Sequence, residues 1–142
     1  MSDAVKYERF LRPILERLKK IDGRAPVSIL TNRIQPENNQ VQTWLREGLT
    51  IEVHTLTHPC PLLQAGNFER ASNVVHGGVD LLSQIKGNNP VSYRMPCCDS
   101  MNSLSPRFFA EIFNKTSADG HYLQIDSSAF IITTSSDKSL PR

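Results

Sequence analysis

The sequence predicts an α/β fold in which helices flank a parallel β-sheet. Segments with helical periodicity alternate along the chain with short apolar runs that are typical of buried strands. The connections between them are short, which favours parallel strands joined by right-handed crossovers. A chain of 142 residues is long enough for one domain with a sizeable core and too short for two ordinary domains.

The first helix is expected over residues 4–21, where apolar side chains recur with a helical period. These positions are Phe10, Leu11, Ile14, Leu15, Leu18 and Ile21. Pro13 falls within the pattern, so either the helix bends there or it begins near Arg12 with proline in its first turn. Gly23 is expected to end the helix. The apolar residues 26–31 then predict a short buried strand.

A second helix is expected over residues 37–47, and a second strand over residues 49–53. Gly48 lies between them as a C-terminal cap. Trp44 shares the apolar face of this helix with Val41. It is therefore expected to pack in the core rather than to stack on a sugar.

The third helix is expected over residues 67–86, with Asn67 as its N-terminal cap. Gly77 and Gly78 lie in its middle, where each glycine weakens a helix by about 1 kcal/mol relative to alanine. The alternative is that the two glycines mark a close approach to a neighbouring element. His76 lies in the same helix and is interpreted as structural, as is His121 further along the chain.

Residues 90–93 predict the next strand, which ends at Arg94. Ser105 and Pro106 are a typical helix start, because serine caps the helix and proline fits its first turn. Two more strands and a loose polar tail are expected at residues 121–126, 129–133 and 135–142.

Composition and charge exclude several classes of function. The net charge is +2, and the 16 Lys and Arg residues are scattered rather than clustered. Neither nucleic acid nor an anionic membrane is therefore an expected partner. No apolar stretch approaches the roughly 18 residues that a spanning helix needs. The polar N-terminus does not resemble a signal peptide, so the chain is expected to be cytoplasmic if Met1 is its true start.

The strongest indication of chemistry is the pair His54 and His58, which directly follows the strand at residues 49–53. Imidazoles at this spacing can project from one side of a turn, and neutral imidazole is the commonest metal-binding side chain. Parallel strands end at one edge of a sheet, so Arg94 is expected near the pair. On pattern alone, two ordinary histidines near a turn are an equal alternative, and Arg94 alone is more typical of a surface salt bridge.

The three cysteines, Cys60, Cys97 and Cys98, do not form a disulfide framework. The favoured interpretation is reduced thiols, with Cys97 and Cys98 as small buried residues rather than nucleophiles. The alternative is that Cys60 and Cys97 line the same pocket. A thiol as a soft metal ligand is a less favoured hypothesis.

Residues 44–59 (WLREGLTIEVHTLTHP) resemble the polysaccharide deacetylase family, also described as the NodB homology domain or carbohydrate esterase family 4. In that family a helix ends in glycine, a strand follows, and His-Ser/Thr-x-x-His closes the segment. Residues 93–97 (YRMPC) resemble the family's Arg-x-Pro-Tyr motif. The order of elements over residues 4–134 is also similar.

The resemblance implies a distorted (β/α) barrel that removes acetyl groups from acetylated sugars with a divalent metal, usually zinc. It also implies a role for six residues of this chain. These are His54 and His58 as metal ligands, Thr55 holding the histidine loop through its hydroxyl, Arg94 orienting the general base, the backbone N–H of Cys97 holding the oxyanion, and Pro96 in substrate binding.

The sequence departs from the family pattern at both ends. The Asp-Asp motif that gives the family its general base and third metal ligand has no counterpart, and neither does the C-terminal motif. A full barrel needs roughly 200 residues or more. We therefore expect residues 1–142 to form a single partial deacetylase domain. The alternatives are a non-catalytic carbohydrate-binding or scaffold domain, or an inactive fragment. The particular sugar, the particular metal and the oligomeric state stay open.

Overall fold

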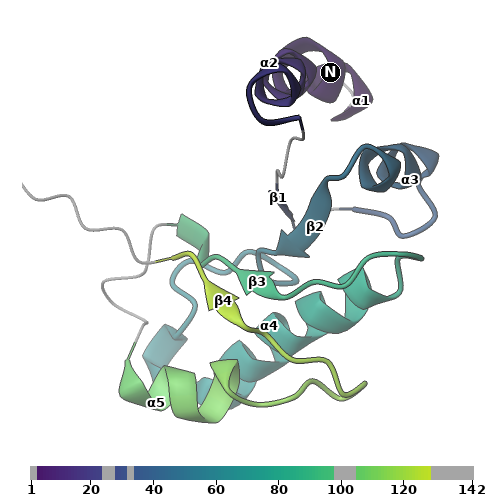
Figure 1. Cartoon of the computed structure of the whole chain (residues 1–142). Coiled ribbons are helices and arrows are strands. Elements are labelled where there is room, and N and C mark those ends of the chain that lie inside the picture. Colours follow the sequence, from purple (N-terminus) through teal and green to yellow (C-terminus); the bar gives the residue numbers. More distant parts are fainter. Residues whose placement is uncertain (1–2, 24–27, 32–33, 98–104, 129–142) are drawn as a thin grey trace, which may run out of the picture.

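The computed structural model describes residues 3–23, 28–31, 34–97 and 105–128. This part of the chain has an α/β fold, with helices beside one β-sheet. Four parallel strands form the sheet in the order β1-β2-β3-β4. Their bounds are Ser28–Thr31, Thr50–Val53, Ser92–Tyr93 and Ile125–Asp126. Each strand lies beside the next one along the chain, as Figure 1 shows. The predicted parallel sheet with flanking helices is confirmed.

The strand register brings the carboxyl ends of β2 and β3 together. β1 and β2 pair from Ser28↔Thr50 to Thr31↔Val53. β2 and β3 share one paired position, Val53↔Tyr93. The chain therefore leaves both strands at the same level, and the segments that follow Val53 and Tyr93 begin side by side.

Side-chain hydrogen bonds join β2 and β3 beyond their one paired position. The carboxylate of Glu52, which is 2% exposed, accepts the backbone N–H groups of Val91 at 2.9 Å and Ser92 at 2.7 Å. The amide of Asn88 accepts from the N–H of Ile51 at 3.2 Å and donates to its carbonyl at 2.9 Å. These polar groups satisfy backbone atoms that a longer strand pairing would otherwise satisfy.

The N-terminal segment is helical in three consecutive pieces. They are α1 (Asp3–Lys6), the π-helical turn Tyr7–Leu11 and α2 (Arg12–Asp22), in which Pro13 lies in the first turn. Gly23 ends α2 in the left-handed conformation, with φ 71°. Pro13 in the first turn of α2 agrees with one of the two alternatives expected for it, and Gly23 ends the helix as expected.

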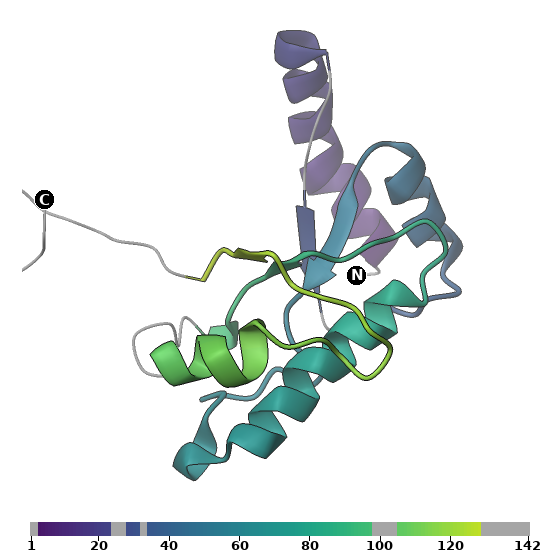
Figure 2. The same ribbon diagram turned by 60° about the horizontal axis from the view of Figure 1, so that its bottom comes forward.

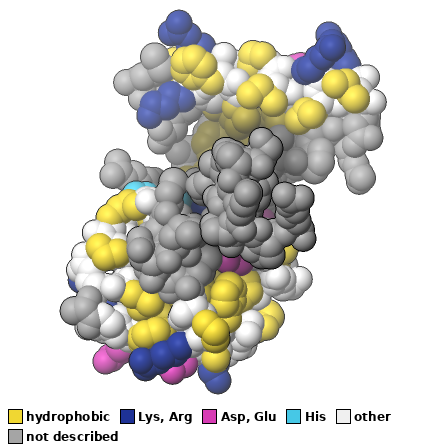
Figure 3. Space-filling view, turned by 90° about the vertical axis from the view of Figure 1, so that its left-hand side faces the viewer, with side chains coloured by type: hydrophobic (Ala, Val, Ile, Leu, Met, Phe, Trp, Pro, Cys, Tyr) yellow, Lys and Arg dark blue, Asp and Glu magenta, His cyan; other side chains and the backbone are white. Residues whose placement is uncertain are grey.

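The predicted burial of the apolar positions of this helix is only partly correct. Tyr7 and Leu15 are buried, and Leu11 and Leu18 pack against the core. Three other apolar positions are exposed, namely Phe10 (58%), Ile14 (55%) and Ile21 (69%). The reason is that one stripe of the helix contacts the domain and the adjacent stripe does not. The top of the face in Figure 3, where Figure 1 places α1, α2 and α3, accordingly exposes hydrophobic side chains among Lys and Arg.

The remaining helices start at side-chain caps. α3 (Asn39–Arg46) is capped by Asn38, and α4 (Phe68–Ser83) by Asn67 after a short 3-10 turn, Gln64–Gly66. Ser105 caps α5 (Pro106–Phe108), which continues as the π-helical turn Phe109–Phe113. In Figures 1 and 2, α4 runs along the sheet with α5 beside it, while α3 lies beside β2, and α1 and α2 lie at the top of Figure 1. Among the described helices, none combines the length and apolar character that crossing a bilayer requires.

The core is formed by side chains from α2, α3, α4, α5, β2 and β3 and from the segments beside them, and neither β1 nor β4 adds a fully buried residue to it. Its largest fully buried side chains include Leu15, Val41, Ile51, Val53, Val75, Leu82, Tyr93, Phe108, Ile112 and Leu123. Trp44 is 6% exposed and its ring lies 5.2 Å from that of Tyr7, so its expected core position is confirmed.

The expected strand over residues 121–126 is too long. Only Ile125–Asp126 is strand, because residues 121–124 follow a turn at 118–119 and do not take up strand pairing. In this turn the N–H of Ser117 donates to the carbonyl of His121 at 2.8 Å, and the N–H of His121 donates to the hydroxyl of Ser117 at 3.0 Å. The expected strand at 129–133 and the tail at 135–142 lie outside the described residues.

Glu47, just after α3, links that helix to the N-terminal helix. Arg12 donates to its carboxylate at 2.8 Å, and the hydroxyl of Tyr7 also donates to it. The hydrogen bond from Arg12 is the largest cause of a lowered pKa of the Glu47 carboxyl, and the bond from Tyr7 is the next. The ionised carboxylate is thus preferred in the folded state.

We expect Glu47→Gln to lower the free energy of unfolding at neutral pH by about 1 kcal/mol, the upper range for partly exposed ion pairs. Because the folded-state pKa of Glu47 is depressed, its contribution is present above the unfolded-state value of 4.5 and is lost as the pH falls through the folded-state pKa. Urea unfolding at about pH 7 and about pH 3 measures this. The variant and wild type should converge at low pH. Glu37→Gln, at an exposed carboxylate before α3, should have little effect at either pH.

Candidate metal centre

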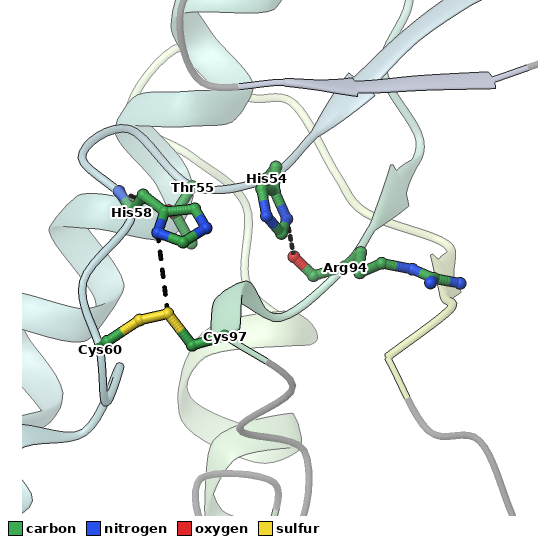
Figure 4. The surroundings of a disulfide bond; sticks show 6 residues. All are labelled: His54, Thr55, His58, Cys60, Arg94 and Cys97. Carbon is green, nitrogen blue, oxygen red and sulfur yellow. Dashed lines mark hydrogen bonds between the residues drawn. A yellow bond between two sulfur atoms is a disulfide. The ribbon is translucent and has the colours of Figure 1, made fainter.

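Two loops meet at the carboxyl ends of β2 and β3. The N–H of Arg94 donates to the carbonyl of Val53 at 3.0 Å, which continues the strand pairing by one residue. The ring nitrogen Nδ1 of His54 lies 2.9 Å from the carbonyl oxygen of Arg94 (Figure 4). The expectation that the histidine loop and the Arg94 loop share one edge of the sheet is confirmed.

The hydrogen bond of His54 fixes which ring nitrogen carries the proton. A carbonyl oxygen only accepts, so Nδ1 of His54 is the donor and Nε2 keeps its lone pair. Burial is the largest cause of a lowered pKa of His54; the charges of His58 and Arg94 lower it further, while the bond to the Arg94 carbonyl raises it. His54 is therefore a neutral imidazole at neutral pH with one nitrogen free, the state in which histidine binds metals.

The histidine loop has an unusual backbone that its neighbours hold in place. Thr55 and His58 have positive φ values of 64° and 53°. Such conformations cost about 1–3 kcal/mol each for residues other than glycine. The hydroxyl of Thr55, which is 1% exposed, accepts the N–H of His58 at 3.1 Å. The N–H of Leu56 donates to the carbonyl of Val74 in α4 at 2.9 Å.

Helix α4 approaches this loop closely at its two glycines. A Cβ at Gly78 would lie 3.1 Å from the carbonyl carbon of Thr55, 3.3 Å from the nitrogen of Leu56 and 3.3 Å from a methyl group of Val53. A Cβ at Gly77 would meet the side chain of Leu56 alone, at 3.1 Å. The interpretation of the glycine pair as a close approach is confirmed, and Gly78 is the position in contact with backbone.

Cys60 and Cys97 bring sulfur to the same place. Their Cα atoms are 5.9 Å apart and their sulfurs form a disulfide, although 37 positions separate them in the sequence. The sulfur of Cys97 lies 3.7 Å from Nδ1 of His58. The favoured expectation of reduced, buried thiols is therefore wrong for this pair, which is exposed and bonded. The physical reason is that each cysteine lies on one of the two loops that meet at the sheet edge. Cys98 lies outside the described residues.

His58, Cys60 and Cys97 form a group of candidate metal ligands. Their ligand atoms all lie within 4.8 Å of one another, and all three residues are exposed. Among the residues that the structure describes, this is the one group of three or more such side chains, and it contains no carboxylate. The ring of His54 borders the group, with its centroid 4.9 Å from that of His58.

The structure places the other expected site residues around this group. The guanidinium of Arg94 points away from the histidines (Figure 4), and its Nε donates to the hydroxyl of Ser127 at 3.2 Å. Pro96 is buried beside Cys97, whose backbone has φ 60°. The structure thus joins the histidines to the backbone of the Arg94 loop, but it does not bring the Arg94 side chain to them.

Sequence reasoning placed Cys60 and Cys97 in one pocket only as the less favoured alternative, and the structure supports that alternative. The position of Cys60 two residues after His58 was the available signal, because alternate residues of a short loop can converge on one ion. The serine at position 128 was also missed, although its hydroxyl accepts the N–H of Met95 at 2.6 Å and fixes the loop after β3. His76 is structural as expected, with Nε2 2.9 Å from the carbonyl of Ile112.

Comparison with known families identifies the chain. The sequence model of the family described as polysaccharide deacetylase matches residues 3–106. This chain therefore belongs to the polysaccharide deacetylase family, as its two motifs indicated. The matched region contains the histidine loop, Arg94 and both cysteines of the disulfide. No curated protein sequence and no solved structure matches the chain significantly.

We expect Gly78→Ala to lower the free energy of unfolding by about 1–3 kcal/mol, as overpacking does. The added methyl group would press on the backbone of the histidine loop. Gly77→Ala is the matched control, because the exposed Leu56 side chain can move aside and alanine favours helix by about 1 kcal/mol. Urea unfolding of both variants measures the difference. Equal stability of the two would contradict a backbone contact at Gly78.

Proposed function

We propose that this chain carries the metal-binding part of a deacetylase that hydrolyses acetyl groups from an acetylated carbohydrate. The observation that carries the proposal is the joined pair of loops, in which His54 and His58 lie at the end of β2 and the Arg94 carbonyl orients His54. Membership of the polysaccharide deacetylase family supports the reaction class.

The side chains present fit a divalent metal, and zinc in particular. Zinc prefers nitrogen and sulfur ligands, and the site offers a free imidazole nitrogen on His54, the ring of His58 and two nearby sulfurs. His54 also has the second hydrogen bond, from Nδ1 to a carbonyl, that is usual for a metal-bound histidine. When bound, the ion supplies Lewis acidity toward an acetyl carbonyl and toward water.

The remaining roles belong to the loop that follows β3. The backbone N–H of Cys97 would donate to the oxyanion that develops on the acetyl group, which is the general way amide donors stabilise such charge. Pro96, which is buried, would take part in substrate binding by shaping the surface beside Cys97. Arg94 would orient the general base; its exposed side chain has a flexible stem that can rotate from Ser127 toward the histidines.

The sheet is proposed to be one sector of the family's (β/α) barrel, with residues 1–142 in a single domain. The strand order supports this. In the sequential order β1-β2-β3-β4 every strand lies beside its neighbour in the chain, as barrels require. Doubly wound sheets instead reverse their strand order near the middle.

A non-catalytic carbohydrate-binding domain is the second candidate. The observation that favours it is the ligand group itself, which contains no carboxylate among the described residues and therefore no evident general base. Such a domain would have the same fold and would bind a carbohydrate, but it would not hydrolyse acetyl groups.

Metal content and acetate release test the proposal together. We expect the purified chain, kept under reducing conditions, to bind one zinc ion and to release acetate from an acetylated oligosaccharide. Both properties should be lost in His54→Ala/His58→Ala, because the two imidazoles are removed. His121→Ala, outside the site, is the control and should retain both. Zinc and sugar binding without acetate release would favour the second candidate, and absence of zinc would contradict the proposed site.

Thr55 is proposed as a positioning residue for His58. We expect Thr55→Ala to weaken zinc binding about tenfold or more, the usual effect of removing a group that orients a ligand. The N–H of His58 loses its acceptor in this variant. Thr55→Ser keeps the hydroxyl and should bind zinc nearly as wild type does. Competition with a chromophoric chelator measures both affinities, and an unchanged affinity in Thr55→Ala would exclude the positioning role.

A further inference from the structure

We infer that Cys60 and Cys97 are metal ligands together with His58, and that the oxidation state of the two thiols decides whether the site can hold its ion. The reduced site would take a thiophilic divalent cation such as zinc, and the disulfide form would not. This inference rests on the proposed function for the presence of a metal, and adds which side chains hold it and what controls it.

The geometry of the three side chains suits one ion. Ligand atoms on a tetrahedral zinc lie roughly 3.3–3.8 Å apart, given bonds of about 2.0–2.3 Å. The 3.7 Å between the Cys97 sulfur and His58 Nδ1 already falls in this range. The whole group lies within 4.8 Å, so side-chain rotation completes the arrangement without a move of either loop.

The spacing of the two cysteines allows both states. Cα atoms 5.9 Å apart are within the disulfide range of about 4.4–6.8 Å. Rotation about the Cα–Cβ bonds separates reduced sulfurs to the distance that a shared ion needs. Because Cys60 and Cys97 are exposed, both an ion and a small oxidant can reach them.

Ligand chemistry determines the class of ion. Two thiolates bring two negative charges to a divalent cation, and thiolates select zinc-like ions over magnesium or calcium. Together with His54, a ligand in the proposed function, the group would supply four nitrogen and sulfur ligands to a tetrahedral zinc ion, and substrate would enter by expansion to five ligands. His54 borders the group, with its ring centroid 4.9 Å from that of His58.

The backbone around the group also points to a specialised site. In the described part of the chain, every residue other than glycine with a positive φ lies here: Thr55, His58 and Cys97. Strained residues of this kind cluster at functional sites and are kept where the surrounding structure holds them. The contacts from α4 and from the Thr55 hydroxyl hold two of the three.

The redox step balances with glutathione disulfide as the oxidant. The two thiolates of Cys60 and Cys97 give up two electrons and form one S–S bond. Glutathione disulfide accepts these electrons as its own S–S bond breaks, and it leaves as two glutathione thiolates. The cysteine thiolates are then no longer available as ligands, and the ion dissociates.

Cobalt absorption spectroscopy tests the inference without an activity assay. Co²⁺ is the probe, because thiolate ligands give it a charge-transfer band in the near ultraviolet that nitrogen and oxygen ligands do not. We expect the reduced wild-type chain to bind one Co²⁺ with this band, and the glutathione-disulfide-treated chain to lose it. Cys60→Ser/Cys97→Ser should lose the band and bind about tenfold or more weakly. Cys98→Ser is the matched control and should keep both the charge-transfer band and the wild-type affinity for Co²⁺.

Each other outcome overturns the inference. The reduced wild type and Cys60→Ser/Cys97→Ser could bind Co²⁺ equally well, without the charge-transfer band. This result would show that the thiolates are not ligands, and it would leave the histidine site of the proposed function standing. Binding that survives oxidation would exclude redox control. Absence of binding in the reduced chain would overturn the inference and the proposed metal site together. Far-ultraviolet circular dichroism of each variant confirms that the fold is retained.

Discussion

The structure depends on the junction between β2 and β3, because every side chain of the candidate site lies on or against the loops that follow these strands. Their backbones pair at one position, Val53↔Tyr93. The buried carboxylate of Glu52 and the amide of Asn88 supply the hydrogen bonds that a longer ladder would give. A buried carboxylate is tolerated here because backbone N–H groups satisfy it. This polar junction sets the level at which both loops leave the sheet.

The histidine loop combines strain with tight support. Its positive φ values at Thr55 and His58 are unfavourable for residues with a Cβ. They are offset by contacts with α4, where Gly78 lets the helix backbone reach the loop and Val74 accepts the N–H of Leu56. The glycine that weakens the helix locally is thus what allows the helix to hold the loop. Stability of α4 and geometry of the site are coupled through this contact.

Local chemistry made much of the fold predictable. Asn67 and Ser105 cap helices as expected, because a cap depends on the few residues beside it. The family and its histidine motif were also found from the sequence. The exposure of Phe10 and the disulfide of Cys60 with Cys97 were not predicted, because both depend on which distant surfaces meet. Periodicity gives a helix its faces but does not say how wide its contact is, and no local signal joins cysteines 37 positions apart.

The two chemistries of Cys60 and Cys97 have the same mechanical effect on the site. A disulfide ties the histidine loop to the loop after β3 by a covalent bond, and a shared ion would tie the same loops by coordination. The disulfide and metal-bound states differ only by rotation of the Cys60 and Cys97 side chains. The backbone contacts at Thr55 and Arg94 therefore need not change between the two states. The scaffold can therefore keep His54 and His58 oriented while the ion is absent. Metal occupancy would then respond to the redox state without the cost of refolding the loops on each exchange.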